Sequence, residues 1–177
     1  MNAHEQLIEI FYVSFQKLDA EGMIDCYHPE VEFSDPVFGR LNAAEVAGMW
    51  RMLCATAKNF ELTFSGVEAS DHTNKHTNNQ TSNQTSNQTS NQTSKLTGRA
   101  HWEARYDFSA TGRRVHNKIE AAFEFKDGKI IKHDDTFDFW KWSAQALGAK
   151  GTLLGWSPLV KNKVRSQARA KLAAFMK

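Results

Sequence analysis

The sequence predicts an α+β fold: a cone-shaped roll in which N-terminal helices pack on a curved antiparallel sheet and enclose a pocket. Three observations support this prediction. Helical patterns come first along the chain, alternating strand patterns follow from Phe60 to Trp142, and polar residues interrupt the apolar face of those strands. We expect residues 1–142 to form this domain and residues 143–177 to be a helical extension of it.

Composition excludes several classes of protein. With 177 residues, of which 41% are hydrophobic, the chain can bury the core of one domain. A net charge of +2 gives no general reason to expect a nucleic-acid partner. The chain has no signal-peptide pattern and no apolar run long enough to span a membrane, so we expect a cytoplasmic protein without a membrane partner. It also shows no nucleotide, flavin or phosphate motif, so we expect no cofactor.

The helical patterns begin near the N-terminus. Apolar residues at helical spacing form one face of a first helix (Leu7, Ile8, Phe11, Phe15, Leu18), which we expect to end at Gly22. Val31 and Phe33 then alternate with polar residues, as in a short strand that leads into Asp35-Pro36. Asn42, with Glu45 three residues on, predicts a capped helix. The buried side of that helix should carry Val46, Met49, Trp50, Leu53 and Ala57.

From Phe60 onward the period changes to two. We expect strands at Phe60–Phe64, Trp102–Phe108, Val115–Phe125 and Ile130–Trp142. Between the first two lies the repeat TNNQTSNQTSNQTSNQTS of residues 77–94, which has no apolar side chain to bury. We interpret residues 71–96 as a low-complexity loop insertion. Ser157-Pro158 is a typical helix start, and it opens a final helix.

The turn at Asp127-Gly128 can close its hairpin in two registers. A two-residue loop would place the aromatic residues of the last strand on the charged face of its neighbour. A three-residue loop pairs Phe125 with Lys129 and keeps the apolar residues on one face, so we choose it. It sets Phe123 opposite Ile131, Ala121 opposite His133, Ile119 opposite Asp135 and Val115 opposite Phe139. A two-residue Thr111-Gly112 loop in the preceding hairpin sets Phe108 beside Val115, Tyr106 beside Asn117 and Trp102 beside Ala121.

These registers divide the sheet into two faces. The apolar face contains a small set of polar residues (Tyr106, Asn117, His133 and Asp135), which predicts a pocket. The other face is charged (His101, Glu103, Arg105, His116, Lys118, Glu120 and Glu124), and we expect it to be solvated or to form a polar subunit contact.

The order of elements resembles the nuclear transport factor 2-like superfamily, which includes ketosteroid isomerase, SnoaL-type polyketide cyclases and limonene epoxide hydrolase. The resemblance covers roughly residues 5–142. Its most specific element is Tyr27 followed by Asp35-Pro36 and Phe38-Gly39, which is similar to the strand and loop that carry the isomerase's catalytic aspartate. The resemblance implies a small apolar ligand and a homodimer built through the outer sheet face.

Three residues are candidates for catalysis. By the resemblance, Asp35 would be a general base, and its apolar neighbours should raise its pKa. Alternatively, its side chain caps a backbone amide in a turn before Pro36. His133 and Asp135, two apart on the inward face, could form an acid–base pair or position a water, or they could be a satisfied buried polar pair. Metal binding by these two with Asp134 and Asp138 is disfavoured, because strand alternation separates the two pairs.

The remaining site predictions concern ligand binding. Tyr106 and Asn117 would orient a ligand oxygen, and the apolar walls would be Trp102, Trp50, Phe137 and Phe123, unless these aromatic residues are ordinary core. The last helix carries lysines and arginines without an acid. These basic side chains could contact an anionic surface, although we expect them to form a solvated face of the helix.

Two departures weaken the chemistry that the resemblance implies. The isomerase's oxyanion donors are a helix tyrosine and a strand acid. Here the strand position is Ala121, the helix position falls near Phe11–Phe15, and Tyr12 is out of phase. The epoxide hydrolase needs an arginine between two aspartates, and Arg105 points outward by parity.

Two hypotheses follow. The first is an isomerase, cyclase or hydrolase that applies acid–base chemistry without a cofactor to an apolar, oxygen-bearing substrate. The second is a non-catalytic ligand-binding or dimeric scaffold protein.

Overall fold

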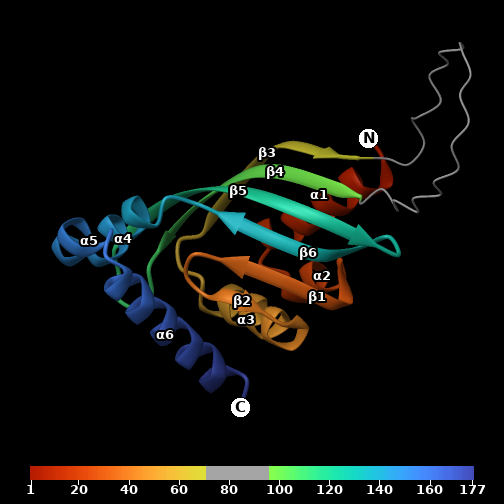
Figure 1. Cartoon of the computed structure of the whole chain (residues 1–177). Helices are drawn as coiled ribbons and strands as arrows, with labels where there is room; N and C mark the ends of the chain where they lie inside the picture. Colours follow the sequence, from red (N-terminus) through yellow and green to blue (C-terminus); the bar gives the residue numbers. More distant parts are fainter. Residues whose placement is uncertain (71–95) are drawn as a thin grey trace, which may run out of the picture.

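A computed structural model describes residues 1–70 and 96–177 (Figure 1). The helices are α1 (Ala3–Gln16), α2 (Ala20–Ile24), α3 (Ala43–Thr56), α4 (Phe139–Leu147), α5 (Ala149–Leu154) and α6 (Pro158–Phe175). The strands are β1 (Tyr27–Asp35), β2 (Gly39–Leu41), β3 (Glu61–Ala69), β4 (Thr97–Asp107), β5 (Arg114–Lys126) and β6 (Lys129–Thr136). The repeat of residues 77–94 lies outside the described residues.

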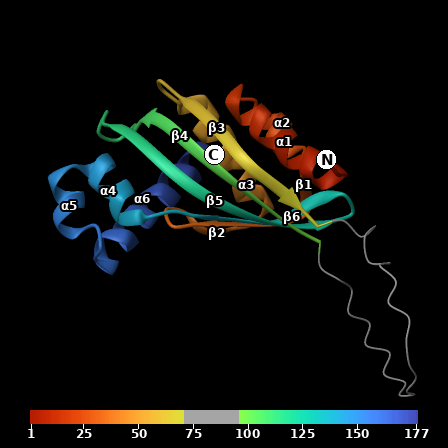
Figure 2. The ribbon, with the colours of Figure 1, turned by 90° about the horizontal axis from the view of Figure 1, so that it is seen from above.

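The strands form one sheet in the order β2-β1-β6-β5-β4-β3. Helix α1 contacts β3 and β4, whereas α3 contacts β1 and β2, so the helices cover one face of the sheet (Figures 1 and 2). This confirms the predicted α+β class. The sheet is mixed rather than purely antiparallel, because β1 pairs with β6 in parallel. The long stretch of chain between these two strands permits that pairing.

Both long N-terminal helices begin with a reciprocal cap. The Asn2 side chain accepts from the Glu5 amide while the Glu5 side chain accepts from the Asn2 amide, and Asn42 and Glu45 repeat the arrangement at α3. The cap predicted at Asn42 is therefore confirmed. The predicted stop at Gly22 is wrong. Helix α1 ends at Gln16, two residues before Leu18 adopts a left-handed φ of 56°, and Gly22 lies inside α2.

Away from the β5–β6 turn the predicted registers are shifted by two residues, which preserves the face of each side chain, whereas next to the turn Ile130 takes the buried place opposite Phe125. Tyr106 pairs with Val115 rather than Asn117, and Phe123 pairs with His133 rather than Ile131. The β5–β6 loop has two residues after all, because Asp127 and Gly128 both have positive φ, as in a type I′ turn. An irregularity then follows in the β5–β6 pairing, where one extra β6 residue restores the apolar side chains to one face.

The strand predicted to run to Trp142 ends at Thr136. Asp138 caps helix α4 by accepting a hydrogen bond from the Lys141 amide, and this local cap replaces further pairing with β5. Phe139 consequently does not face Val115 across the sheet. Instead Trp142 packs with Val115 and Ala146 in a small second core.

Helix α6 starts at the predicted Ser157-Pro158 and returns along the molecule toward α3 (Figure 1). Its Leu172 is 2% exposed. Arg169 fastens it to the turn between β1 and β2, with Nε donating to the Phe38 carbonyl at 2.9 Å and Nη2 donating to the Arg40 carbonyl. The final helix is therefore bound to the turn that follows Asp35.

The outer sheet face is charged, as predicted. His116 Nε2 lies 2.6 Å from Glu103, and His101 Nδ1 lies 2.7 Å from Glu120. Lys118 Nζ completes the cluster at 3.0 Å from Glu103. A homodimer contact on this face stays a prediction.

Replacing Gly151 with alanine is expected to destabilise the contact of α5 with α4. A Cβ atom at Gly151 would overlap the Ser143 carbonyl group, so the two helices would have to separate. Overpacking of this kind costs about 1–3 kcal/mol of unfolding free energy, measurable by urea denaturation. Lys150→Ala, at the neighbouring exposed position, is the control and should change stability by less than about 0.5 kcal/mol. An unchanged Gly151→Ala variant would contradict the close packing.

Candidate functional site

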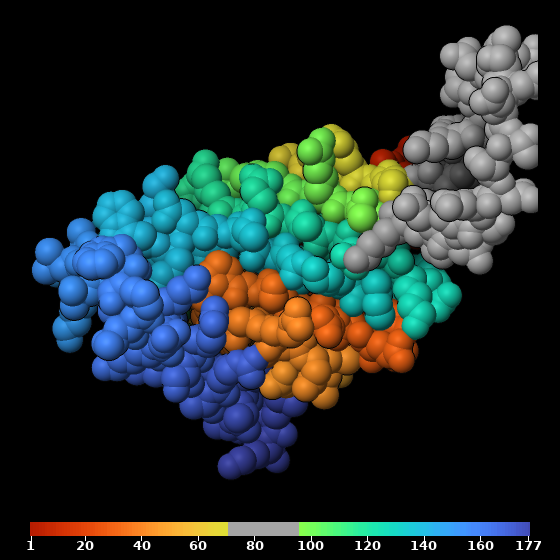
Figure 3. Space-filling model, viewed as in Figure 1, coloured from red at the N-terminus to blue at the C-terminus, as the bar shows by residue number. Residues whose placement is uncertain are grey.

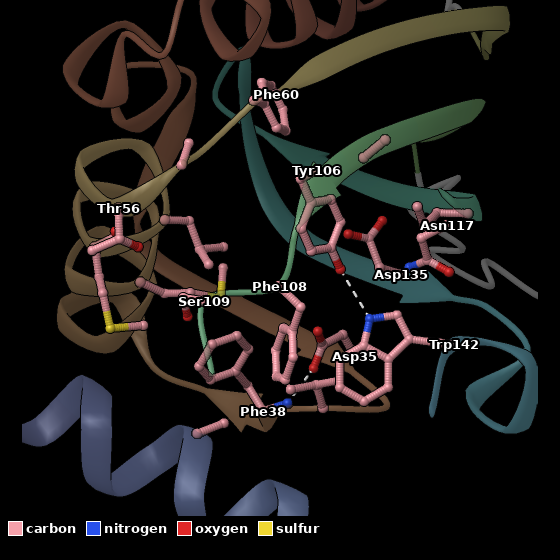
Figure 4. A pocket seen from close by; sticks show the side chains of 18 of the residues that line it. Asp35, Phe38, Thr56, Phe60, Tyr106, Phe108, Ser109, Asn117, Asp135 and Trp142 are labelled. Carbon is pink, nitrogen blue, oxygen red and sulfur yellow. Dashed lines mark hydrogen bonds between the residues drawn. The ribbon is translucent and has the colours of Figure 1, made fainter. Parts of the chain in front are cut away.

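The concave side of the sheet encloses a cavity of about 480 Å³. Its walls come from β1, α3, β4, β5, β6, α4 and α6, so segments from both ends of the chain meet there (Figure 4). Most of the predicted site residues line it: Asp35, Asp135, Tyr106, Asn117, Trp102, Trp50 and Phe137. The wall is largely aromatic and aliphatic, which is typical of a site for a small apolar molecule.

Asp35 stands at the end of β1, where Pro36 follows. Its Oδ1 accepts a hydrogen bond from the Phe38 amide at 2.5 Å, which caps the turn. Burial raises the pKa of Asp35 to about 7, against the lowering effect of that hydrogen bond, and the nearby Asp135 raises it further. The two arrangements considered for Asp35 therefore occur at once, because its carboxyl group caps the turn and also lines the cavity.

Asp135 lies on β6 and is 5% exposed. Its Oδ1 accepts hydrogen bonds from Trp102 Nε1 at 3.2 Å and from His133 Nε2 at 3.0 Å. Because both bonds end on one oxygen, the carboxyl group is held in one orientation. Its other oxygen has no protein donor among the described residues.

His133 lies behind Asp135 and does not line the cavity. It is fully buried, and its Nδ1 is 2.7 Å from the Tyr27 hydroxyl, which accepts from Trp50 Nε1 at 3.1 Å. Burial raises the pKa of Tyr27 well above its usual value, so the hydroxyl keeps its proton and can donate it to His133 Nδ1. With the Tyr27 hydroxyl donating to Nδ1, the ring nitrogen Nε2 is the one that donates to Asp135.

Tyr106 supplies a second polar group to the cavity. Its hydroxyl accepts from Trp142 Nε1 at 2.9 Å (Figure 4). Burial raises the pKa of Tyr106 to about 12, the bond from Trp142 lowers it and the charge of Asp35 raises it. Because its oxygen already accepts, its proton is available to a ligand oxygen.

Trp142 is the site residue that sequence reasoning missed. We predicted it at the end of a strand, whereas α4 turns its indole into the cavity. The signal that could have located it is Asp138, which stands where an N-cap would stand before an apolar run.

Phe123 is the other displaced residue. It is 1% exposed, packs on the His133 ring at a centroid distance of 4.5 Å, and does not line the cavity. The two-residue shift of register explains this, because it sets Phe123 directly opposite His133. Phe123 therefore supports the histidine and does not form a cavity wall.

The positions compared above with the isomerase's oxyanion donors and the hydrolase's arginine add no hydrogen-bond donor to the cavity. Tyr12 is fully buried rather than out of phase, but it does not line the cavity, and its hydroxyl has no hydrogen-bond partner among the described residues. Ala121 pairs with Asp135 across the sheet. Arg105 lies on the outer face, 3.9 Å from Glu103.

No cluster of metal ligands is found within residues 1–70 and 96–177. Asp134 illustrates why. Its carboxyl group binds the Ser34 hydroxyl at 2.6 Å and Lys132 at 2.7 Å, on the opposite side of the strand from Asp135.

Comparison with known proteins gives a family and a fold. The sequence pattern of the SnoaL-like domain matches residues 8–133. Among curated proteins, none matches the chain.

Three solved structures illustrate the shared fold. TerC, co-crystallised with polyporic acid, has a TM-score of 0.59 and 15% identity, over 83% of this chain and 100% of its own. An LEH-like epoxide hydrolase of M. tuberculosis has a TM-score of 0.54 and 17% identity, over 89% and 95%. A candidate polyketide cyclase from Xanthomonas campestris has a TM-score of 0.54 and 14% identity, over 81% and 96%.

Proposed function

Because the chain belongs to the SnoaL-like domain family, we propose that it is an enzyme that moves protons on an apolar, oxygen-bearing small molecule bound in the cavity. One observation carries this proposal: among the carboxyl groups that line the largely apolar cavity, Asp35 and Asp135 lie within it (Figure 4), whereas Asp107 is bound to Asn59 and lies 3.6 Å from Arg114. Carboxyl pairs in unlike environments are the usual basis for dividing acid and base roles.

The two carboxyl groups differ in a way that suits this division. Asp35, with a pKa of about 7, is present in both protonated and ionised forms at neutral pH, so it can give or accept a proton. Asp135 is held by His133 and Trp102 with one oxygen left for the ligand. We assign proton exchange to these two residues and a positioning role to His133, which does not reach the cavity.

Tyr106 and Asn117 complete the proposed site. A carbonyl oxygen of the ligand would accept the Tyr106 proton, which stabilises negative charge on that oxygen as a proton leaves the neighbouring carbon. The chemistry that fits is isomerisation or cyclisation next to a carbonyl group. Epoxide hydrolysis is a weaker candidate because Arg105 lies on the outer face.

A non-catalytic ligand-binding protein is the second candidate, favoured by the same apolar lining. A thermal-shift screen with apolar ketones, lactones and epoxides distinguishes the two, with each hit then tested for turnover. We expect at least one ketone or lactone to stabilise the wild type and to be converted by it. A ligand bound without conversion would support the binding protein. If no compound stabilises the chain, the proposal of a ligand site fails.

A further inference from the structure

A group of large apolar side chains is exposed at one end of the molecule. Its members, which we call the apolar tip, are Trp140, Leu153, Leu154, Trp156 and Leu159, with exposed fractions of 45%, 71%, 53%, 73% and 77%. They come from α4, the end of α5, the connection that follows it (Trp156) and the start of α6. Figure 3 shows these helices together at the end of the molecule away from the C-terminus of α6.

The polar groups of the apolar tip are satisfied within the tip. Trp140 Nε1 donates to the Thr152 carbonyl at 3.1 Å, and Trp156 Nε1 donates to the Leu153 carbonyl at 3.1 Å. The first bond also ties α4 to α5, so Trp140 lies beside the end of α5 that carries Leu153 and Leu154. Exposed apolar groups that gather in this way usually mark a contact surface.

The helices of the apolar tip are basic, and Asp138, the acid beside them at the start of α4, lies 3.7 Å from Lys141. Every charged side chain from Phe139 to Lys177 is a lysine or arginine. Lys150 and Lys163 have no acidic partner within residues 1–70 and 96–177, and Lys161 lies over the Phe139 ring at 5.9 Å. Apolar and tryptophan side chains beside unpaired lysines are typical of surfaces that lie on anionic lipid.

We infer that the apolar tip docks peripherally on an anionic lipid surface. A second copy of the chain is the less favourable occupant, because a symmetric contact would bring two sets of lysines together, and Asp138, the acid beside the tip, is already paired with Lys141. No helix within the described residues is long and apolar enough to cross a bilayer. The sequence-based expectation of no membrane partner rested on the lack of a spanning segment, and a peripheral contact needs none.

Docking would also bring the cavity close to lipid. Helices α4 and α6, which carry part of the apolar tip, supply cavity walls through Trp142, Leu147, Val164 and Ala168. An apolar ligand dissolved in the bilayer would then be near its site. The docking itself does not depend on any activity, so its test needs no substrate.

Vesicle co-sedimentation of the full chain tests the inference. We expect binding to phosphatidylcholine vesicles only when they contain phosphatidylglycerol, with loss of binding at high salt. The emission of exposed Trp140 and Trp156 should shift to the blue and be quenched by brominated acyl chains, since Trp50, Trp102 and Trp142 are already buried.

Two variants define the contact. Trp156→Ser with Leu159→Ser should reduce vesicle binding at least about tenfold, because burial of apolar area drives insertion. Ile10→Ser is the matched control, since Ile10 is 55% exposed on α1 and should leave binding unchanged. Lys150→Gln with Lys163→Gln should weaken binding about fivefold per lysine removed.

Three results would overturn the inference. The first is equal binding to neutral and anionic vesicles, and the second is unchanged binding of the Trp156/Leu159 variant. The third is a wild-type oligomer that binds no vesicles and that this variant converts to a monomer, since the tip would then be a contact between copies.

Discussion

Asp35→Asn is expected to lower kcat by about 10²–10⁴-fold on a substrate found by the screen, while ligand binding persists. The amide has the same shape and keeps an oxygen that can accept the Phe38 amide hydrogen, so the turn is retained. It cannot exchange a proton, and general acid–base catalysis contributes a factor of this size. Steady-state kinetics and thermal shifts on the same ligand provide the two readouts.

Asp138→Asn makes the same chemical change outside the cavity. Its side chain is 48% exposed and caps α4, a role that asparagine fills equally well. This control should keep wild-type kcat. If Asp35→Asn turns over at the wild-type rate, Asp35 has no part in the chemistry.

The same substitution should change stability in a pH-dependent way. Asp35 has a pKa of about 7 in the folded chain against 3.8 for an unperturbed aspartate, so the folded state binds more protons between these values. The unfolding free energy of the wild type therefore falls as pH rises from 4 to 7. The Asp35→Asn variant does not titrate at this position, so its unfolding free energy at pH 8 should exceed that of the wild type by up to about 4 kcal/mol. Near pH 4 this difference should vanish. Urea denaturation at both pH values measures it.

His133→Phe is expected to destabilise the fold by about 3 kcal/mol or more. The ring would fit, because His133 is surrounded by aromatic side chains, including Phe123 at 4.5 Å and Phe33 at 5.1 Å between ring centroids. The loss comes from the two polar groups that it bonds, Tyr27 and Asp135, each of which is left buried with one partner fewer. Each such group costs about 1–3 kcal/mol. Urea denaturation gives the difference.

Tyr27→Phe is the matched variant for this prediction. It keeps the bond between His133 and Asp135 but removes the hydroxyl from two buried groups, Trp50 Nε1 and His133 Nδ1, so its cost should be similar, about 3 kcal/mol. Because the two residues share a bond, the double variant should cost less than the sum of the single ones. A double variant whose cost equals the sum of the two single costs would show that the two side chains do not depend on a shared bond.

Local chemistry made much of the fold predictable. Asn42 with Glu45, and Ser157 with Pro158, are signals whose physics is contained in a few residues, and both helices begin there. The inward face of the sheet was predictable for a related reason. A shift of two residues leaves side-chain parity unchanged, so Asp135 and Tyr106 faced inward although both registers were wrong.

The remaining errors depend on non-local geometry. The β5–β6 hairpin combines a short turn with an irregularity, and each compensates for the other, so apolar patterning alone cannot separate this pair from a longer loop. Trp142 followed an alternating pattern that suits a strand and a helix start alike. Whether an inward residue lines the cavity or lies behind it, as His133 does, depends on depth in three dimensions and leaves no mark on the pattern.

Phe38 connects the C-terminal helix to the chemistry of Asp35. Its amide donates to the Asp35 carboxyl group, and its carbonyl accepts from Arg169 on α6. One residue thus connects a helix at the far end of the chain to the carboxyl group that we propose exchanges the proton. We therefore expect the pKa of Asp35 to depend on the position of α6, so a fusion or truncation in this helix should alter the cavity although its sequence lies far from Asp35.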